Sequence, residues 1–339
     1  MKSVLIGMSG GVDSSVAAAL LKEQGYNVIG ASMNLWSESV LDDAKKVCDF
    51  LDIEFRALDF RAMFRDKVVE YFVNSYESGQ TPNPCVVCNK YLKFGAMLDY
   101  ALDNGIDYIA TGHYAKITKN ENGIYELKTS DAAKKDQTYF LYNLTQHQLS
   151  HTLMPLGEYN KSEVRAVAAK LSLPAANKPD SEDICFVEDG DYAGFIRAYS
   201  GKPPVPGDIK DTLGNVIGKH NGLIYYTIGQ RKGIGAYGRP MFVMSIDPNE
   251  NSITLGEKGM EFSDSLTAEN LNFISGVFPT EPMEVQVKIR CQSQPVPAVL
   301  YPDGDTVKAV FKEPQRAVTP GQSAVFYTGA ALLGGGTIV

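Results

Sequence analysis

A glycine-rich segment near the N-terminus has the composition of an anion-binding loop. Ser9-Gly10-Gly11-Val12-Asp13-Ser14 lies between a short apolar segment and a stretch with helical spacing of apolar residues. Two adjacent glycines let the backbone approach a ligand closely, and successive N–H groups can then line an anion site. The N-terminus of the following helix would strengthen the attraction for phosphate. The segment is neither a Walker A loop nor a dinucleotide Gly-x-Gly-x-x-Gly motif, and the alternative is a tight turn that caps a helix.

Three of the five cysteines form a second group of reactive side chains. Cys85 and Cys88 follow a proline-rich loop at the start of an expected helix, and Cys185 comes much later in the chain. A thiol near a helix N-terminus has a lowered pKa, so we expect more of it to be thiolate at neutral pH. A structural zinc site that uses His113 as fourth ligand and a thioredoxin-like dithiol are the alternatives. Cys48 lies on the apolar face of an expected helix and is interpreted as a buried hydrophobic residue.

These groups need a scaffold that brings distant segments together, and the first part of the chain predicts one. Short apolar strands alternate with segments of helical periodicity, which is typical of a parallel sheet with right-handed crossovers. Asn160 and Glu163 form a capping box for the last of these helices. The expected strands are Ser3–Gly7, Tyr26–Met33, Glu54–Phe60 and Asp107–Thr111, and the clearest helices are Asp13–Gln24 and Lys161–Leu171.

The pattern changes after Gly201, where twelve of the 17 prolines lie. Short alternating segments separated by Gly, Pro, Asn and Asp predict all-β structure. The expected strands are Leu223–Ile228, Met241–Ile246, Met283–Ile289 and Thr306–Phe311. We therefore predict a doubly wound α/β domain with a parallel sheet over residues 1–200, then a central β domain over 201–257 and a C-terminal β-barrel over 258–339.

Composition limits the classes of protein that fit this chain. Its 339 residues are 44% hydrophobic and 21% charged, which is typical of globular proteins. No uncharged apolar run reaches the roughly 18 residues of a membrane span. Five cysteines are an odd number and do not indicate a disulfide scaffold, so we expect a reducing cytoplasm. The net charge, 32 − 40 = −8, provides no general basic surface, so an RNA partner would need local basic sites.

The glycine-rich loop resembles that of the ATP pyrophosphatase superfamily, whose members split ATP into AMP and pyrophosphate to adenylate a substrate. Further motifs make the resemblance more specific, because together they are similar, in order and over nearly the whole chain, to the tRNA-specific 2-thiouridylase family. They are Gly7 to Ser14, Thr81-Pro82-Asn83-Pro84, Cys88-Asn89-Lys90, Ala110–Tyr114, Lys135-Asp136-Gln137, Ile184-Cys185-Phe186, Gly229–Gly233 and Thr319–Tyr327.

The resemblance implies ATP- and Mg²⁺-dependent replacement of the C2 oxygen of the wobble uridine by sulfur. A uracil carbonyl is a poor electrophile, and transfer of AMP to its oxygen activates it; sulfur must then arrive as a strong nucleophile. By resemblance, Cys185 carries the persulfide, and Cys88 is the nucleophile that releases sulfide or closes a disulfide with Cys185. The implied partners are the anticodon loop of tRNA and a sulfur donor such as a cysteine desulfurase or a sulfur-carrier protein. We expect a monomer with no membrane attachment.

The resemblance also assigns binding residues. For ATP they are Gly7, Met8, Ser9, Gly10, Gly11, Val12, Asp13, Ser14, Met33 and Gly112. For tRNA they are Asn83, Pro84, Cys85, His113, Lys135, Asp136, Gln137, Arg290, Cys291 and Gln322.

Two positions depart from the family pattern. Cys85 stands where the better-known branch has Asp, and Cys291 stands where an aromatic residue is frequent. Cys85, Cys88 and Cys185 also resemble the ligand set of tRNA thiolases that hold an iron–sulfur cluster through three cysteines. The alternatives are therefore a cluster-dependent thiolase that acts on another base, and a non-catalytic tRNA-binding module with a structural metal.

Overall fold

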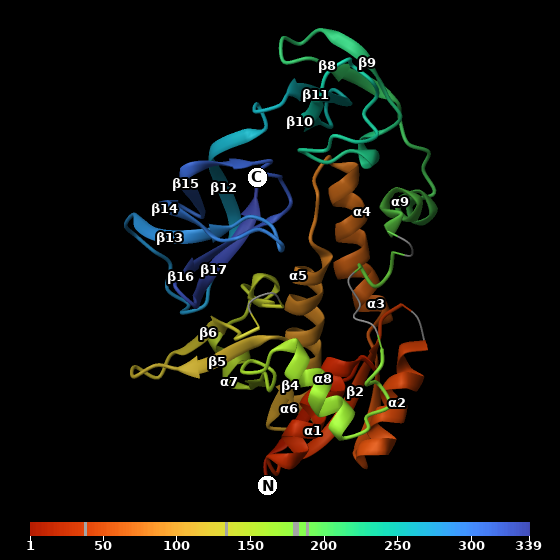
Figure 1. Ribbon diagram of the computed structural model, residues 1–339, viewed down its shortest axis with the longest axis vertical. Helices are drawn as coiled ribbons and strands as arrows, with labels where there is room; N and C mark the ends of the chain where they lie inside the picture. Colours follow the sequence, from red (N-terminus) through yellow and green to blue (C-terminus); the bar gives the residue numbers. More distant parts are fainter. Residues whose placement is uncertain (37–38, 133–134, 179–182, 188–189) are drawn as a thin grey trace.

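The computed structural model describes residues 1–36, 39–132, 135–178, 183–187 and 190–339. Within the described chain before residue 200, five parallel strands form one sheet in the order β3-β2-β1-β4-β7. Figure 1 shows this sheet at the N-terminal end of an elongated molecule. The strands are β1 (Ser3–Gly7), β2 (Asn27–Asn34), β3 (Glu54–Asp59), β4 (Tyr108–Ala110) and β7 (Thr152–Leu153).

Alternating side chains of the sheet are buried against helices on both of its faces. Val4 and Ile6 point to one face and pack with α1, α2 and α8, whereas Leu5 points to the other and packs with α6. Doubly wound α/β architecture is thereby confirmed. The helices are α1 (Val12–Glu23), α2 (Ser39–Leu51), α3 (Arg61–Phe64), α4 (Glu70–Glu77), α5 (Pro84–Cys88), α6 (Met97–Asp103), α7 (Gln146–Ser150), α8 (Lys161–Lys170) and α9 (Tyr192–Ser200).

Two of the helical segments are longer than these bounds suggest. A π-helical turn, η1 (Arg65–Val69), joins α3 to α4, and a second one, η2 (Asn89–Ala96), joins α5 to α6. Short 3₁₀ turns are η3 (Thr138–Phe140) and η5 (Leu223–Tyr225). The capping box predicted from Asn160 and Glu163 is present at the start of α8. Among the described residues, none of the helices combines the length and the apolar character needed to cross a bilayer.

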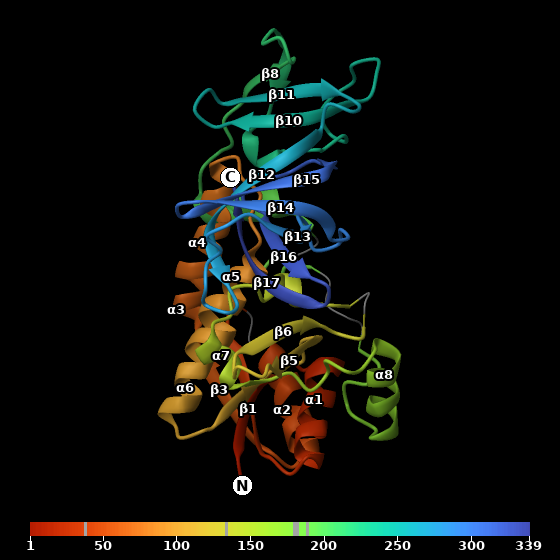
Figure 2. The ribbon, with the colours of Figure 1, turned by 90° about the vertical axis from the view of Figure 1, so that its left-hand side faces the viewer.

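Two all-β units follow, and Figure 2 shows them stacked above the α/β domain. The central sheet has the order β10-β11-β8-β9, and the C-terminal strands close into a barrel through the pairing of β12 with β17. The central strands are β8 (Gly207–Lys210), β9 (Val216–His220), β10 (Met241–Asp247) and β11 (Ser252–Glu257). The barrel strands are β12 (Phe262–Phe273), β13 (Met283–Lys288), β14 (Val296–Asp303), β15 (Thr306–Arg316), β16 (Ser323–Thr328) and β17 (Ala331–Ile338).

The strand expected over Leu223–Ile228 is wrong, because the chain there forms η5 and an irregular turn. The side chain of Gln230 accounts for the difference. Its Oε1 accepts from the Thr227 N–H at 2.9 Å, and its Nε2 donates to the Tyr225 carbonyl at 3.1 Å. The backbone groups that would pair with a neighbouring strand are satisfied locally instead.

A hairpin of the α/β domain joins it to the barrel. The hairpin strands β5 (Ala115–Lys119) and β6 (Tyr125–Thr129) extend the barrel sheet, with Leu127 opposite Leu332 and Lys128 opposite Ala331. One continuous hydrophobic core includes Leu5 of the parallel sheet, Leu127 of the hairpin and Leu332 of the barrel. The α/β domain and the barrel therefore hold each other in a defined orientation.

Replacement of Gly30 by alanine is expected to destabilise the α/β domain because of Cys48. A Cβ at Gly30 would lie 2.3 Å from Cys48 Sγ, which is fully buried on α2 and whose pKa is raised to about 11 by that burial. Overpacking of this kind costs about 1–3 kcal/mol of unfolding free energy. Urea unfolding of Gly30→Ala, Cys48→Ala and the double variant measures the coupling. The double variant should be more stable than Gly30→Ala, and simple additivity of the two single losses would contradict the contact.

Candidate functional site

The glycine-rich loop connects β1 to α1, and within it the Ser9 and Gly11 N–H groups donate to the hydroxyls of Ser14 and Ser9. Gly10 has a φ of +68°, and a Cβ there would lie 2.7 Å from Cβ of Asp43, so glycine is required at this turn. Gly11 is the N-cap of α1, and no side chain caps it. The Ser15 hydroxyl instead donates to the Gly11 carbonyl at 2.7 Å. The first amides of α1 therefore retain donor capacity toward an anion such as a phosphate group.

Gly112 lies against this loop where β4 ends. A Cβ at Gly112 would be 2.9 Å from the backbone nitrogen of Ser14 and 3.0 Å from the carbonyl carbon of Asp13. In the sheet, the chain runs outward from β1 to β2 and β3 on one side and to β4 and β7 on the other. Ligands of open α/β sheets bind at the point where the strand order reverses in this way. Gly10 and Gly112, two of the ATP residues assigned by resemblance, thus both contribute to the shape of this crevice.

The carboxylate of Asp13 has two partners that the sequence did not indicate. Lys161 Nζ lies 2.7 and 2.9 Å from its two oxygens, and the Tyr114 hydroxyl donates to it at 2.7 Å. Lys161 is the first residue of α8 and is far from Asp13 in sequence. No local pattern distinguishes it from a solvated helix lysine, and only the packing of α8 on α1 brings it to the loop.

The three predicted thiols come into electrostatic range of one another. The pKa of Cys88 is raised to about 12, first by burial and then by the charges of Cys185 and Cys85, while Lys93 acts in the opposite direction. Cys88 is only 8% exposed. Cys85 and Cys185 are accessible to solvent, yet the surrounding protein still raises the pKa of both, with desolvation as the first cause.

The expectation of a lowered thiol pKa is therefore wrong for this conformation. Cys88 is the last residue of α5, and its environment contains Phe64, Phe72 and Leu92. A thiolate in such apolar surroundings loses more hydration energy than the helix N-terminus and Lys93 return. The resting Cys88 is accordingly a neutral thiol at neutral pH.

The segment that carries Cys185 is held by an aromatic anchor. Phe186 is buried, with ring centroids 5.3 Å from Phe72, 5.5 Å from Phe64 and 5.1 Å from Phe195. These ring contacts anchor the segment that carries Cys185. The sequence pattern contained the signal, since an aromatic residue directly follows the cysteine.

The cysteines do not lie as a ready ligand set for a metal. Among the described residues, no three His, Cys, Asp or Glu side chains are grouped so that they could hold a metal ion. The arrangement of the three thiols therefore does not fit a cluster or a zinc site.

His113 is a buried neutral imidazole between the loop and the thiols. It is 9% exposed, its Nδ1 lies 2.8 Å from the Thr111 hydroxyl, and its ring is 5.7 Å from that of Phe94. Burial, and secondly Lys93, keep its pKa well below the usual value. Its neighbour Gly112 touches the loop. The dipeptide Gly112-His113 thus contacts the nucleotide loop through one residue, while the other is subject, like the thiols, to the charge of Lys93.

Several residues assigned to tRNA by resemblance make internal contacts. Asp136 accepts from the Thr138 hydroxyl at 2.6 Å, and burial raises the pKa of its carboxyl. Gln137 accepts from the Tyr114 N–H at 3.0 Å. Arg290 donates to the Ala317 carbonyl at 2.8 Å. These hydrogen bonds hold loops in place. The role of these residues in tRNA binding stays a prediction.

The barrel closes over the loop that precedes Cys85. Gln322 Nε2 donates to the Thr81 carbonyl at 2.8 Å, and the Thr81 N–H donates to the Pro320 carbonyl at 2.9 Å. Asn83 is then the N-cap of α5 and Pro84 its first residue, a favoured position for proline. Cys291 is half-buried in the shared core, and the charge of Cys85 contributes to its raised pKa after burial.

The remaining predicted residues complete the site's surroundings. Met33, at the end of β2, packs against both the shared core and the cluster that contains Cys88. Lys135 follows the undescribed residues 133–134, and its backbone N–H donates to the Ala132 carbonyl at 2.7 Å. The sequence did not indicate that the charge of Lys93 acts on all three thiols, because a lysine in a helix carries no signal by itself.

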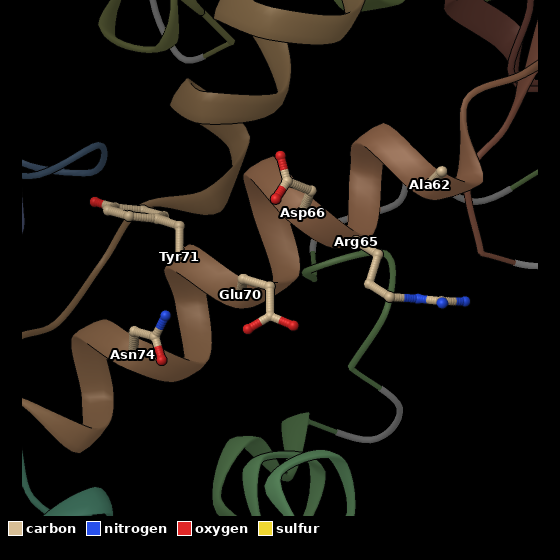
Figure 3. A pocket seen from close by; sticks show the side chains of 6 residues that line it. All are labelled: Ala62, Arg65, Asp66, Glu70, Tyr71 and Asn74. Atoms are coloured by element: carbon tan, nitrogen blue, oxygen red, sulfur yellow. The ribbon is translucent and has the colours of Figure 1, made fainter.

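Two cavities border the helix that contains Asp66 and Tyr71. One of about 340 Å³ separates α5 from the barrel, and its lining includes Asn83, Lys90 and Tyr91. The Lys90 ammonium lies 5.4 Å from the Tyr91 ring centroid. A second, of about 670 Å³, follows the α3–α4 helix and contains none of the predicted site residues (Figure 3). Its mixed Arg65, Asp66 and Glu70 lining favours no single ligand class.

Comparison with known proteins finds relatives over nearly the whole chain. Three family models match in succession: a tRNA methyl transferase HUP domain over residues 2–189, a tRNA methyl transferase PRC-barrel domain over 193–257 and an aminomethyltransferase beta-barrel domain over 263–338. The tRNA-specific 2-thiouridylase MnmA of Clostridioides difficile is 51% identical, covering 99% of this chain and 98% of the relative.

Two further relatives bear the same name. That of Lachnoclostridium phytofermentans is 50% identical over the full length of both chains, and that of Acetivibrio thermocellus is 51% identical over 99% of both. The model descriptions mention methyl transfer, whereas the full-length relatives are named for thiolation, and the clustered thiols suit the latter. With the loop, the thiols and the whole chain matched in this way, the protein belongs to the tRNA-specific 2-thiouridylase family.

Proposed function

We propose that this chain catalyses ATP-dependent 2-thiolation of a uridine in tRNA. The observation that carries the proposal is the link made by Gly112 and His113. One residue contacts the nucleotide loop, and the other shares the electrostatic environment of Lys93 with the thiols. This proximity supports a site that activates an oxygen with ATP beside a site that delivers sulfur.

The first step transfers AMP to the C2 oxygen of uridine. That oxygen attacks the α-phosphorus of ATP, the bond to the β-phosphate breaks, and pyrophosphate leaves. The uncapped amides of α1, with Gly7 to Ser14 and Gly112, bind the phosphates, and Met33 contacts the adenine. Mg²⁺ would enter with the nucleotide, because it prefers phosphate oxygens and water to an all-protein cage.

The second step delivers sulfur to the activated carbon. The terminal sulfur of a Cys185 persulfide attacks C2 and AMP leaves with the bonding electron pair. The Cys88 thiolate then attacks the Cys185 sulfur, which releases the thiolated base and leaves a Cys88–Cys185 disulfide. A thiol reductant restores the two cysteines before the next turnover.

The tRNA is proposed to enter between the barrel and the α/β domain. Support comes from the cleft beside α5, where Asn83, Lys90 and Tyr91 combine hydrogen-bonding, basic and aromatic groups. Such groups suit an unstacked loop nucleotide. We expect further residues to border this path, where they either contact tRNA or hold the loops that contact it. They are His113, Lys135, Asp136, Gln137, Arg290, Cys291 and Gln322.

We also propose that the protein is a monomer, that it acts in the cytoplasm, and that it receives sulfur from a separate donor protein. The donor must present sulfane sulfur, as a cysteine desulfurase or a sulfur-carrier protein does. Accessible Cys185 is the acceptor in this scheme.

The test is reconstitution with an unmodified tRNA transcript, ATP, Mg²⁺ and a persulfide-generating desulfurase. Pyrophosphate release and mass spectrometry of the digested nucleosides are followed together. We expect 2-thiouridine at the wobble position and pyrophosphate release that depends on tRNA. A transcript with cytidine at that position is the matched control and should give neither product.

Two results would contradict the proposal. Pyrophosphate release without any thiolated nucleoside would indicate a different adenylated substrate. Thiolation that requires a bound iron–sulfur cluster, recognised by iron and acid-labile sulfide analysis of anaerobically purified protein, would replace the persulfide route.

A further inference from the structure

We propose that Lys93 stabilises the negative charge that forms on sulfur during its transfer from Cys185 and the attack by Cys88. The inference rests on the proposed sulfur transfer and adds to it a group that the cysteine motifs do not contain.

The π-helical turn η2 places Lys93 on the side of the helix that carries the thiols. In a regular α-helix with 3.6 residues per turn, a residue five positions after Cys88 would point roughly 140° away from it. Instead, Cys88 is the N-cap of η2, which is π-helical over Asn89–Ala96 and ends with an i→i+5 bond from the Met97 N–H to the Leu92 carbonyl. That wider turn brings residues five apart nearly above one another, and such turns are frequent at functional sites.

The surroundings of Lys93 agree with this placement. Its charge acts on the thiols of Cys85, Cys88 and Cys185 and on the imidazole of His113, and in each case it favours the anion or disfavours the cation. These groups come from three segments that are distant in the chain: α5, the residues after β4, and the segment with Cys185. The charge of one ammonium thus acts on both sulfurs that the reaction uses.

Within the described residues, Lys93 has no carboxylate within 4.0 Å and no hydrogen-bond partner, although its side chain is half-buried. A partly desolvated cation without a partner is unfavourable for the resting protein. Neutral thiols around it cannot compensate the charge. An anionic persulfide or thiolate formed among them would, because the attraction between opposite charges is strong in a site shielded from water.

This arrangement also explains how a resting thiol with a pKa of about 12 can take part. When the persulfide of Cys185 attacks, negative charge appears on sulfur, and it then moves to the Cys88–Cys185 pair as the product leaves. Lys93 is positioned to stabilise that charge throughout, while His113 stays neutral and does not compete for it.

The experiment compares Lys93→Met and Lys93→Arg with the wild type, and Lys170→Met on the exposed end of α8 is the matched control for loss of a lysine. Three quantities are measured with the full chain and transcript tRNA: 2-thiouridine formation, tRNA-dependent pyrophosphate release, and the rate at which iodoacetamide alkylates each cysteine, followed by peptide mass spectrometry.

For Lys93→Met we expect thiolation to fall by about 10- to 100-fold and alkylation of Cys88 to slow, with pyrophosphate release unchanged. Lys93→Arg should restore much of the thiolation, because it keeps the charge. Normal thiolation by Lys93→Met would overturn the proposal. An equal loss of thiolation in Lys93→Met and Lys93→Arg, together with loss of pyrophosphate release, would also overturn it, because that result indicates a packing role. If Lys93→Met does not fold, Lys93→Gln replaces it. Failure of the wild type to thiolate would instead refute the proposed function.

Discussion

Replacement of Cys185 by serine is expected to abolish 2-thiouridine formation, by about a thousandfold or more, and to leave tRNA-dependent pyrophosphate release unchanged. A hydroxyl cannot carry sulfane sulfur, whereas the nucleotide loop that performs adenylation does not involve this side chain. Parallel measurement of pyrophosphate and of thiolated nucleoside separates the two steps. The same separation is expected for Cys88→Ser, since the adduct on Cys185 could no longer be resolved.

Cys85→Ser is the control for both variants, because Cys85 lies on α5 with Cys88 and its charge acts on both Cys88 and Cys185. The persulfide route needs only Cys88 and Cys185, so Cys85→Ser should retain thiolation. Loss of activity in all three variants would instead indicate that the thiols act as one ligand set. Loss of pyrophosphate release in Cys185→Ser would show that the cysteine contributes to adenylation, contrary to the scheme.

Replacement of Gly112 by valine is expected to reduce pyrophosphate release and thiolation together, by about 100-fold. The first side-chain carbon would lie 2.9 Å from the Ser14 nitrogen, so the loop must shift away from β4. A displacement near 1 Å moves the phosphates out of alignment with the attacking oxygen. ATP titration with pyrophosphate detection measures the loss, and urea unfolding verifies that the variant is folded.

Gly105→Asn serves as the control for the Gly112 experiment. Gly105 has a left-handed backbone, a conformation that asparagine tolerates, and nothing lies within 4 Å of an added Cβ. Its activity should match the wild type. If Gly112→Val released pyrophosphate normally, the loop would not depend on close approach of β4, and the assigned ATP crevice would be wrong.

Much of the architecture followed from local patterns. The strand Ser3–Gly7 has the bounds predicted for it, and the capping box of Asn160 and Glu163 is present. Apolar periodicity and helix-capping residues involve only a few adjacent positions, so they can be recognised in the sequence without knowledge of tertiary contacts. The segment Leu223–Ile228 shows the limit, because Gln230 satisfies its backbone through a side chain that a pattern of apolar residues does not register.

The order of the motifs determined the family, and the residue types determined the chemistry: a phosphate-binding loop and thiols. Only the tertiary structure decided how the thiols behave. Whether Cys88 is a thiolate depends on desolvation by Phe64 and Phe72, and that desolvation is a property of packing between segments distant in the chain. Only the structure showed that Lys161 pairs with Asp13 and that the charge of Lys93 acts on Cys88. Electrostatic interactions depend on distance in space, and the residues next to a lysine in the sequence do not determine that distance.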